Sequence, residues 1–169
     1  MCHYARMASD RVRELKALLD RLAERAEFHG GPTAEDQILR EEVIGDFIAG
    51  GADLLDEATP FMWAYYRSTA ARFTPEERVH CGIQEITDSA DIWEHVQFQH
   101  PPEWRPGGGP LTPGRCYLSF EGEVSWEPEH GLQLVYEDGR RVCKVSQYDG
   151  HVTVAHAYGD SSLLGVVFG

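Results

Sequence analysis

The 169-residue sequence is short of basic residues. It has 15 Lys and Arg against 28 Asp and Glu, which gives a formal net charge of −13. A field of that sign repels phosphate groups, so we expect neither nucleic acid nor an anionic membrane as a partner. The same charge attracts a basic protein, although it also serves solubility alone. The charge balance therefore leaves two interpretations open, a solvated acidic protein or a protein that binds a basic partner.

Long apolar segments and secretion signals are also missing. No apolar run approaches the roughly 20 residues that a membrane span needs, and no apolar segment near the N-terminus is typical of a signal peptide. The four cysteines lie far apart with no C-x-x-C pair, a spacing typical of reduced and mostly buried thiols. These absences predict a cytoplasmic protein that is not attached to a membrane.

Sequence motifs with a known mechanism are absent as well. The chain has no phosphate-binding P-loop, no G-x-G-x-x-G, no H-E-x-x-H and no G-x-S-x-G. The sequence therefore favours a protein with no cofactor and no catalytic residue over an enzyme.

Helical periodicity is present through the first half of the chain. Apolar residues recur every three or four positions over residues 9–28, and their narrow stripe is a candidate homodimer surface. Thr33 then opens a second helix as N-cap, and Gly50 and Gly51 end it. We expect its buried side to consist of Ile38, Leu39, Val43, Ile44, Phe47 and Ile48.

A further helical segment covers residues 52–73. Pro60 predicts a break or kink, with Thr59 as the cap of the helix that follows. Thr74 and Glu77 have the spacing of a capping box, so a short helix is expected directly after Thr74.

Strand periodicity dominates the second half. Alternation predicts strands over residues 92–98, 116–126, 132–136, 141–145 and 151–158, and the Asp-Gly pair at 138–139 predicts a tight hairpin turn. Residues 99–114 hold five Pro and four Gly, which predicts a loop. Helices first and an antiparallel meander second indicate an α+β fold, with N-terminal helices packed on a C-terminal sheet. We divide it into a helical extension, 1–51, and an α+β domain, 52–169.

A metal site is one candidate for the histidines. Histidine and carboxylate are zinc ligands, and His130, His151 and His156 are the candidate set. However, His151 and His156 are five residues apart on an expected strand, which places them on opposite faces. Scattered structural histidines therefore remain the favoured interpretation, with no metal.

Acid–base catalysis by Glu129 and His130 is a second candidate. These neighbours point apart in an extended segment but converge in a turn, and a catalytic pair needs hydrogen-bond reach. The alternative is a turn in which Gly131 takes a positive φ and His130 bonds to nearby backbone. The turn is the favoured interpretation.

An acidic helical surface is the third candidate. Eight acids and a single base lie between residues 35 and 57. Such helices are commonly charged for solvation, but they can also steer and hold a basic active site. The acids that we expect to bind a partner are Glu41, Glu42, Asp46, Asp53, Asp56 and Glu57.

The stretch "WEPEHGLQLVYEDGRRVCKVSQYDGHVT" resembles a family of uncharacterised bacterial domains with a Trp-acid-x-Glu-His-Gly signature, an Asp-Gly hairpin and a downstream Asp-Gly-His. "FMWAYYR" and "DIWEHVQF" are similar to upstream parts of that family. The likeness covers about residues 55–168. It implies that the chain is similar to immunity proteins of bacterial toxin systems, and it implies no catalytic residue.

The expected function is therefore that of an immunity or antitoxin-like protein, which neutralises a basic toxin domain through its acidic surface. A small hydrolase or metal-dependent enzyme that uses Glu129, His130, His151 or His156 is the first alternative. An interaction module that forms oligomers through the helix at 9–28 is the second.

Overall fold

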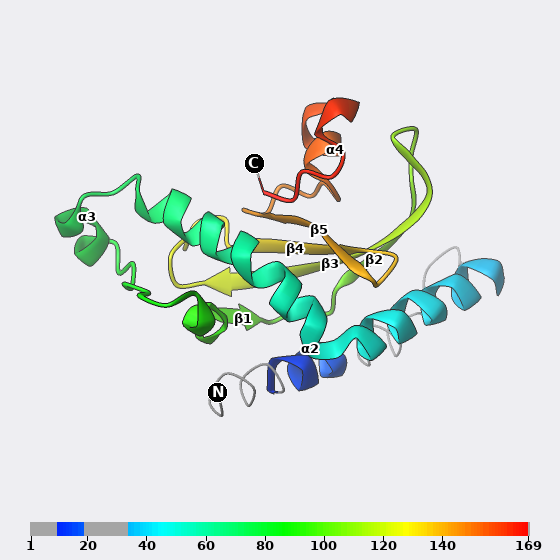
Figure 1. The fold of residues 1–169 in the computed structure, drawn as a ribbon, viewed down its shortest axis with the longest axis horizontal. Coiled ribbons are helices and arrows are strands. Elements are labelled where there is room, and N and C mark those ends of the chain that lie inside the picture. Colours follow the sequence, from blue (N-terminus) through cyan, green and yellow to red (C-terminus); the bar gives the residue numbers. More distant parts are fainter. Residues whose placement is uncertain (1–9, 19–33, 169) are drawn as a thin grey trace.

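The structure is a computed structural model that describes residues 10–18 and 34–168. N-terminal helices precede an antiparallel sheet and the long helix among them packs on one face of it, as Figure 1 shows, so the predicted α+β class is confirmed. Residues 10–18 are helical. The remainder of the helix predicted at 9–28, and the predicted N-cap Thr33, lie outside the described residues.

The sheet contains β1 (Val96–Phe98), β2 (Glu103–Gly108), β3 (Thr112–Val124), β4 (Leu132–Glu137) and β5 (Arg141–Ser146). β4 pairs with one edge of β3 and with β5, whereas β1 and β2 both pair with the other edge of β3. β1 and β2 are thus one interrupted edge strand. The prediction of a loop over 99–114 is partly wrong, because residues 103–108 and 112–114 are strand and only 99–102 and 109–111 are not. An edge strand needs partners on one side only and so tolerates Pro106 and glycine.

The predicted Asp-Gly hairpin between β4 and β5 is confirmed. Asp138 and Gly139 have φ angles of 51° and 68°, the left-handed values that such a turn requires. A Cβ atom on Gly139 would lie 2.1 Å from the carbonyl oxygen of Val43, so the turn packs directly against helix α2 (Ala34–Ala70).

Helix α2 (Ala34–Ala70) is bent once. Gly51 leaves helical geometry with φ 52°, ψ −125°, which confirms the predicted end of the first helical segment at its glycines. The predicted break at Pro60 and cap at Thr59 are wrong, because Pro60 lies inside the helix and Thr59 Oγ1 donates to the Leu55 carbonyl at 2.8 Å. Ala58 and Met62 are fully buried beside them, so packing outweighs a proline cost of about 3 kcal/mol.

Two short helices connect α2 to the sheet. Helix α3 (Pro75–His80) begins with the predicted capping box of Thr74 and Glu77, which is confirmed. The strand predicted at 92–98 is largely wrong: residues Ser89–His95 form the 3-10 helix η1, and only β1 is extended. The Asp88 side chain accepts the Ala90 N–H and so starts this helix.

The strand predicted at 151–158 is also wrong. Helix α4 (Val154–Tyr158) occupies this segment, followed by the 3-10 helix η2 (Ser161–Leu163). Thr153 caps α4 by accepting the His156 N–H, and Gly159 ends it with φ 64°. After η2, Val145 N–H of β5 donates to the Val167 carbonyl at 2.8 Å, so the C-terminal segment covers part of the sheet edge.

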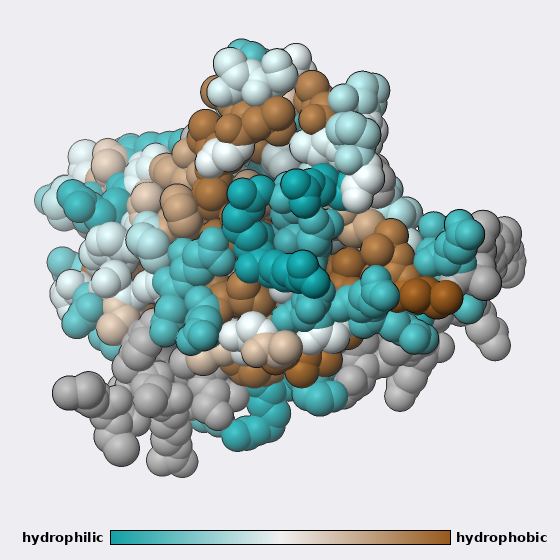
Figure 2. All heavy atoms as spheres, turned by 45° about the vertical axis from the view of Figure 1, so that its right-hand side comes forward, coloured by the Kyte–Doolittle hydropathy of each residue, from teal (hydrophilic) through white to brown (hydrophobic). Residues whose placement is uncertain are grey.

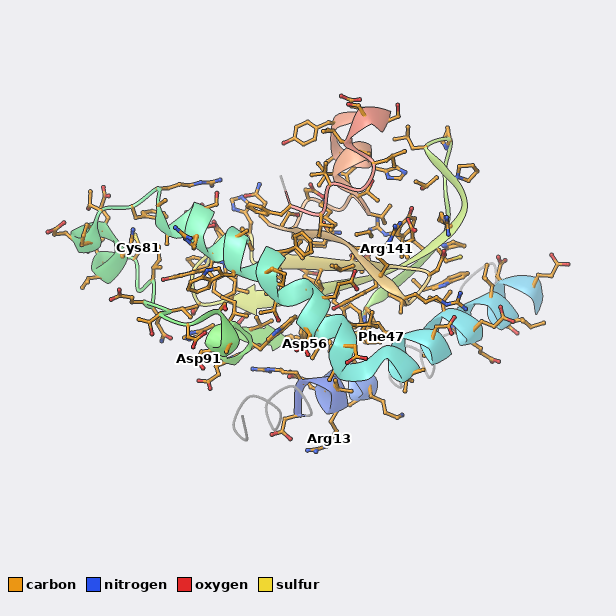
Figure 3. The ribbon with its side chains drawn as sticks, viewed as in Figure 1. Arg13, Phe47, Asp56, Cys81, Asp91 and Arg141 are labelled. Carbon is orange, nitrogen blue, oxygen red and sulfur yellow. The ribbon has the colours of Figure 1, made fainter. Side chains whose placement is uncertain are left out.

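The main core lies between α2 and the sheet. Phe47, labelled in Figure 3, packs on Phe120 and Tyr136 with ring centroids 5.2 and 4.9 Å away. Leu15 and Leu18 belong to the same core. The expected buried side of α2 is partly wrong, because three of its members are exposed, namely Ile38, Leu39 and Ile48.

The other face of the sheet carries a smaller core of Tyr117, Val135, Cys143 and Val152. The predicted division after residue 51 coincides with the bend of α2, and whether the two parts are separate domains stays a prediction. In the described residues, no helix has both the length and the apolar composition to cross a membrane.

Candidate functional site

A hollow of about 470 Å³ opens where the turn between β3 and β4 meets the β1–β2 connection. The register of β1 on β3, with Gln97 opposite Glu123 and Phe98 opposite Gly122, brings these separate segments together. The lining residues are Gln99, His100, Glu121, Gly122, Glu123, Val124, Glu127, Pro128, Glu129, His130 and Gly131. Glu129 and His130, two of the predicted site residues, therefore line an open hollow together with a further histidine, His100.

The turn itself is organised by Glu127. Its Oε1 accepts the N–H groups of Glu129 and His130 at 3.3 and 3.4 Å, and its carbonyl accepts the Gly131 N–H at 3.1 Å. Gly131 has φ 62°, which confirms the predicted positive angle at this position. A side chain at Gly131 would lie 2.5 Å from the Gly122 carbonyl, so a glycine is required here.

Two contacts from other elements hold the turn in place. The Tyr65 hydroxyl of α2 donates to the Gly131 carbonyl at 2.7 Å, and the Tyr148 N–H donates to the His130 carbonyl at 3.3 Å. The preceding residue, Trp126, is fully buried and packs edge-on against Tyr65 and Tyr66. Trp126 thus packs on the helical layer and fixes the start of the turn.

Three potential metal ligands converge at this turn. One donor atom each from Glu127, Glu129 and His130 lies within 4.8 Å of the others. His130 Nδ1 is 3.5 Å from Glu127 Oε1. Glu129 and His130 are exposed and Glu127 is partly buried, so solvent reaches the group from the side of Glu129 and His130.

The electrostatic environment of the hollow is negative. Four carboxylates line it, and its described lining contains no Lys or Arg. Burial, and secondly the charge of Glu127, raise the pKa of the Tyr65 hydroxyl well above its ordinary value. Tyr65 therefore stays neutral and acts as a hydrogen-bond donor to the turn.

The other predicted histidines lie apart from this group. His151 Nδ1 is 3.4 Å from Asp149 Oδ1. His156 Nδ1 is 2.7 Å from Thr153 Oγ1, and its ring lies edge-on to Tyr117. Within the described residues, neither joins His130 in a cluster of metal ligands.

Glu127 is a site residue that the sequence analysis missed. The signal that could have identified it is its position three residues before His130, in a turn that contains Pro128.

The six predicted partner-binding acids of α2 differ in what they contact. Asp46 forms an ion pair with Arg140 at 2.7 Å, and Glu57 Oε2 accepts the Val142 N–H of β5 at 3.3 Å. Asp56, labelled in Figure 3, is exposed after the bend of α2. The remaining exposed acids, Glu41, Glu42 and Asp53, form no ion pair with any residue that the structure describes.

Comparisons with known proteins identify the family of this chain but no activity. A search of curated proteins gave no match to this chain, and a search of solved structures gave none either. A family model described as "Domain of unknown function (DUF6985)" matches residues 17–152. The match begins well before the likeness expected from about residue 55 and spans more than half of the chain. The chain therefore belongs to the DUF6985 family, a domain of unknown function.

Proposed function

We propose that this protein is an immunity or antitoxin-like protein of the bacterial cytoplasm. It binds a basic toxin domain through the acidic surface of α2 and blocks that domain without performing chemistry. The observation that carries the proposal is the exposure of Glu41, Glu42 and Asp53, which no described basic side chain neutralises.

Charge placement supports this function over a solvated surface alone. Unneutralised carboxylates speed association with a basic protein and fix its orientation, and their effect weakens with added salt. Ile38 and Ile48 are exposed along the same helical segment, so apolar contact area lies close to the acids. Figure 2 shows a comparable mixture on one face of the molecule, where hydrophilic side chains gather across the middle with hydrophobic patches beside them.

The two alternatives stay predictions. The oligomer alternative needs the apolar stripe of the helix at 9–28 to face a second copy. In the described part of that helix, Leu15 and Leu18 of the stripe are instead buried in the chain's own core. Arg11 also ties that segment to the Trp93 carbonyl at 3.0 Å. The enzyme alternative draws support from the accessible hollow at Glu129 and His130.

Co-expression with the product of the adjacent reading frame tests the proposal. We expect the adjacent product to be toxic alone and harmless when this protein is present. A harmless neighbour, or toxicity that persists with this protein present, contradicts the proposal.

Matched double variants locate the binding surface. Glu41→Gln/Glu42→Gln and Glu76→Gln/Glu85→Gln remove the same charge from exposed positions on different elements. We expect the α2 pair alone to lower the association rate with the purified toxin domain, by about tenfold at low salt, since steering alters rates by about 10–1000-fold. Equal effects of the two pairs would mean that net charge, and not α2, governs binding.

A further inference from the structure

We propose that Glu127, Glu129 and His130 bind a divalent transition-metal ion, with Zn²⁺ the ion that fits the donor set. This site is independent of the acidic surface of α2 and is formed by a different part of the fold. It also differs from the histidine set that the sequence offered as an alternative to no metal at all, because His130 is the one member that it retains.

The donor geometry fits a tetrahedral ion. Zn²⁺ binds imidazole nitrogen and carboxylate oxygen at about 2.0–2.2 Å, which places two ligands of a tetrahedron about 3.4 Å apart. His130 Nδ1 and Glu127 Oε1 are already separated by 3.5 Å. The third donor, from Glu129, is within 4.8 Å of both, and its exposed side chain can rotate to shorten that distance.

The turn preorients the ligands. The N–H groups of Glu129 and His130 both donate to Glu127 Oε1, at 3.3 and 3.4 Å, which fixes the orientation of the carboxylate. The second oxygen, Oε2, accepts neither of these N–H groups and keeps its lone pairs for an ion. Tyr65 and Tyr148 anchor the backbone of the same turn through the carbonyls of Gly131 and His130. Outer contacts of this kind orient metal ligands and strengthen binding.

The charge of the hollow selects a cation. Glu121 and Glu123 line it beside the three ligands, and no Lys or Arg occurs among its described lining residues. His100 lines the same hollow from the β1–β2 connection, so the imidazoles come from two separate segments. Nitrogen donors favour Zn²⁺ over Mg²⁺ and Ca²⁺, which prefer ligand sets made of oxygen alone.

Zinc titration of the full chain tests the site. The protein is treated with chelator, dialysed and titrated with ZnCl₂ by calorimetry, in parallel with MgCl₂. We expect one Zn²⁺ per chain and a higher midpoint of thermal unfolding with Zn²⁺ present, because an ion that binds only the folded state stabilises it. The absence of Zn²⁺ binding, or tighter binding of Mg²⁺, would overturn the assignment.

Variants separate this site from the other histidines. We expect His130→Ala and Glu129→Gln each to weaken Zn²⁺ binding by about tenfold or more. Changing a residue that only orients a metal ligand already weakens metal binding about tenfold, and these two variants remove a ligand itself. His151→Ala is the matched control, since His151 is also exposed and beside a carboxylate but lies outside the cluster. Because both positions are exposed, we expect the two variants to keep the fold, which circular dichroism checks. Undiminished binding in His130→Ala, or an equal loss in His151→Ala, would overturn the proposal.

Discussion

The hydroxyl of Tyr65 donates a hydrogen bond to the carbonyl of Gly131, 66 residues later in the chain, at 2.7 Å. This bond joins the C-terminal part of α2 to the turn that carries Glu127, Glu129 and His130. Burial keeps the hydroxyl protonated, because it raises the pKa of Tyr65. The side chain of Tyr65 therefore links the core helix directly to the turn of the candidate site.

The first prediction concerns this bond. Tyr65→Phe removes the hydroxyl and leaves the Gly131 carbonyl without its donor, so we expect the free energy of unfolding to fall by about 1–3 kcal/mol. Urea denaturation measures the change. Tyr158→Phe is the control, because Tyr158 is 70% exposed, and it is expected to change stability by less than about 0.5 kcal/mol. Equal effects of the two variants would show that the Tyr65 bond adds no stability.

The second prediction concerns the β4–β5 hairpin. Gly139→Ala strains a left-handed residue and places a methyl group 2.1 Å from the Val43 carbonyl. Left-handed strain costs about 1–2 kcal/mol and overpacking about 1–3 kcal/mol, so we expect a loss of about 2–5 kcal/mol. Gly150→Ala is the control for strain alone, because Gly150 has φ 78° and open space around its Cα.

Thermal or urea unfolding compares the two variants directly. The larger loss in Gly139→Ala would confirm that the turn and α2 are in close contact. A loss no greater than that of Gly150→Ala would contradict the packing of the hairpin against Val43.

Local signals in the sequence identified some elements well and others poorly. The capping box of Thr74 and Glu77 and the Asp-Gly turn at 138–139 act within a few residues, and both predictions are confirmed. At residues 151–158 the alternation of apolar residues indicated a strand, but the cap at Thr153 and the left-handed Gly159 define a helix. Capping residues were the stronger signal at that position, because they satisfy backbone groups directly.

The remaining differences depend on tertiary contacts. Pro60 stays inside α2 because its neighbours Ala58 and Met62 are buried against the core. His100 joins the hollow because β1 pairs with β3, and nothing near residue 100 in the sequence predicts that pairing. Glu129 and His130 were identified from their chemistry, whereas their approach to Glu127 required the geometry of the turn.

The third prediction concerns acid stability. Lys144 is 1% exposed in its side chain, and its Nζ donates to Asp149 Oδ1, to the His151 carbonyl and to Gln133 Oε1. Burial lowers the pKa of Lys144. Burial alone would raise the pKa of Asp149, but hydrogen bonds from Lys144 and from the His151 N–H outweigh it, so the pKa lies below its ordinary value of 3.8.

A carboxylate with a lowered pKa stabilises the folded state above its unfolded pKa, and that contribution is lost as the pH falls through the folded pKa. We therefore expect the wild-type free energy of unfolding to decrease below pH 3.8 more steeply than that of Asp149→Asn. The midpoints of urea unfolding, measured for both proteins from pH 6 down to about pH 2, give this comparison. Asp53→Asn, an exposed change of the same type, is expected to keep the wild-type slope; the same slope in all three proteins would contradict the role of Asp149.

The fourth prediction separates the acids of α2 within the proposed function. Arg140 forms an ion pair with Asp46 at 2.7 Å and so neutralises its charge. Glu41 lies five residues earlier in α2 and forms no ion pair with any described Lys or Arg. Because an already neutralised carboxylate contributes little to the field that a basic partner meets, Asp46→Asn should slow association less than Glu41→Gln does. Stopped-flow association rates with the toxin domain, at low and high salt, measure both effects. Arg140→Gln completes the comparison: it exposes the charge of Asp46 and is expected to speed association, and a slower rate in that variant would show that Arg140 itself contacts the partner.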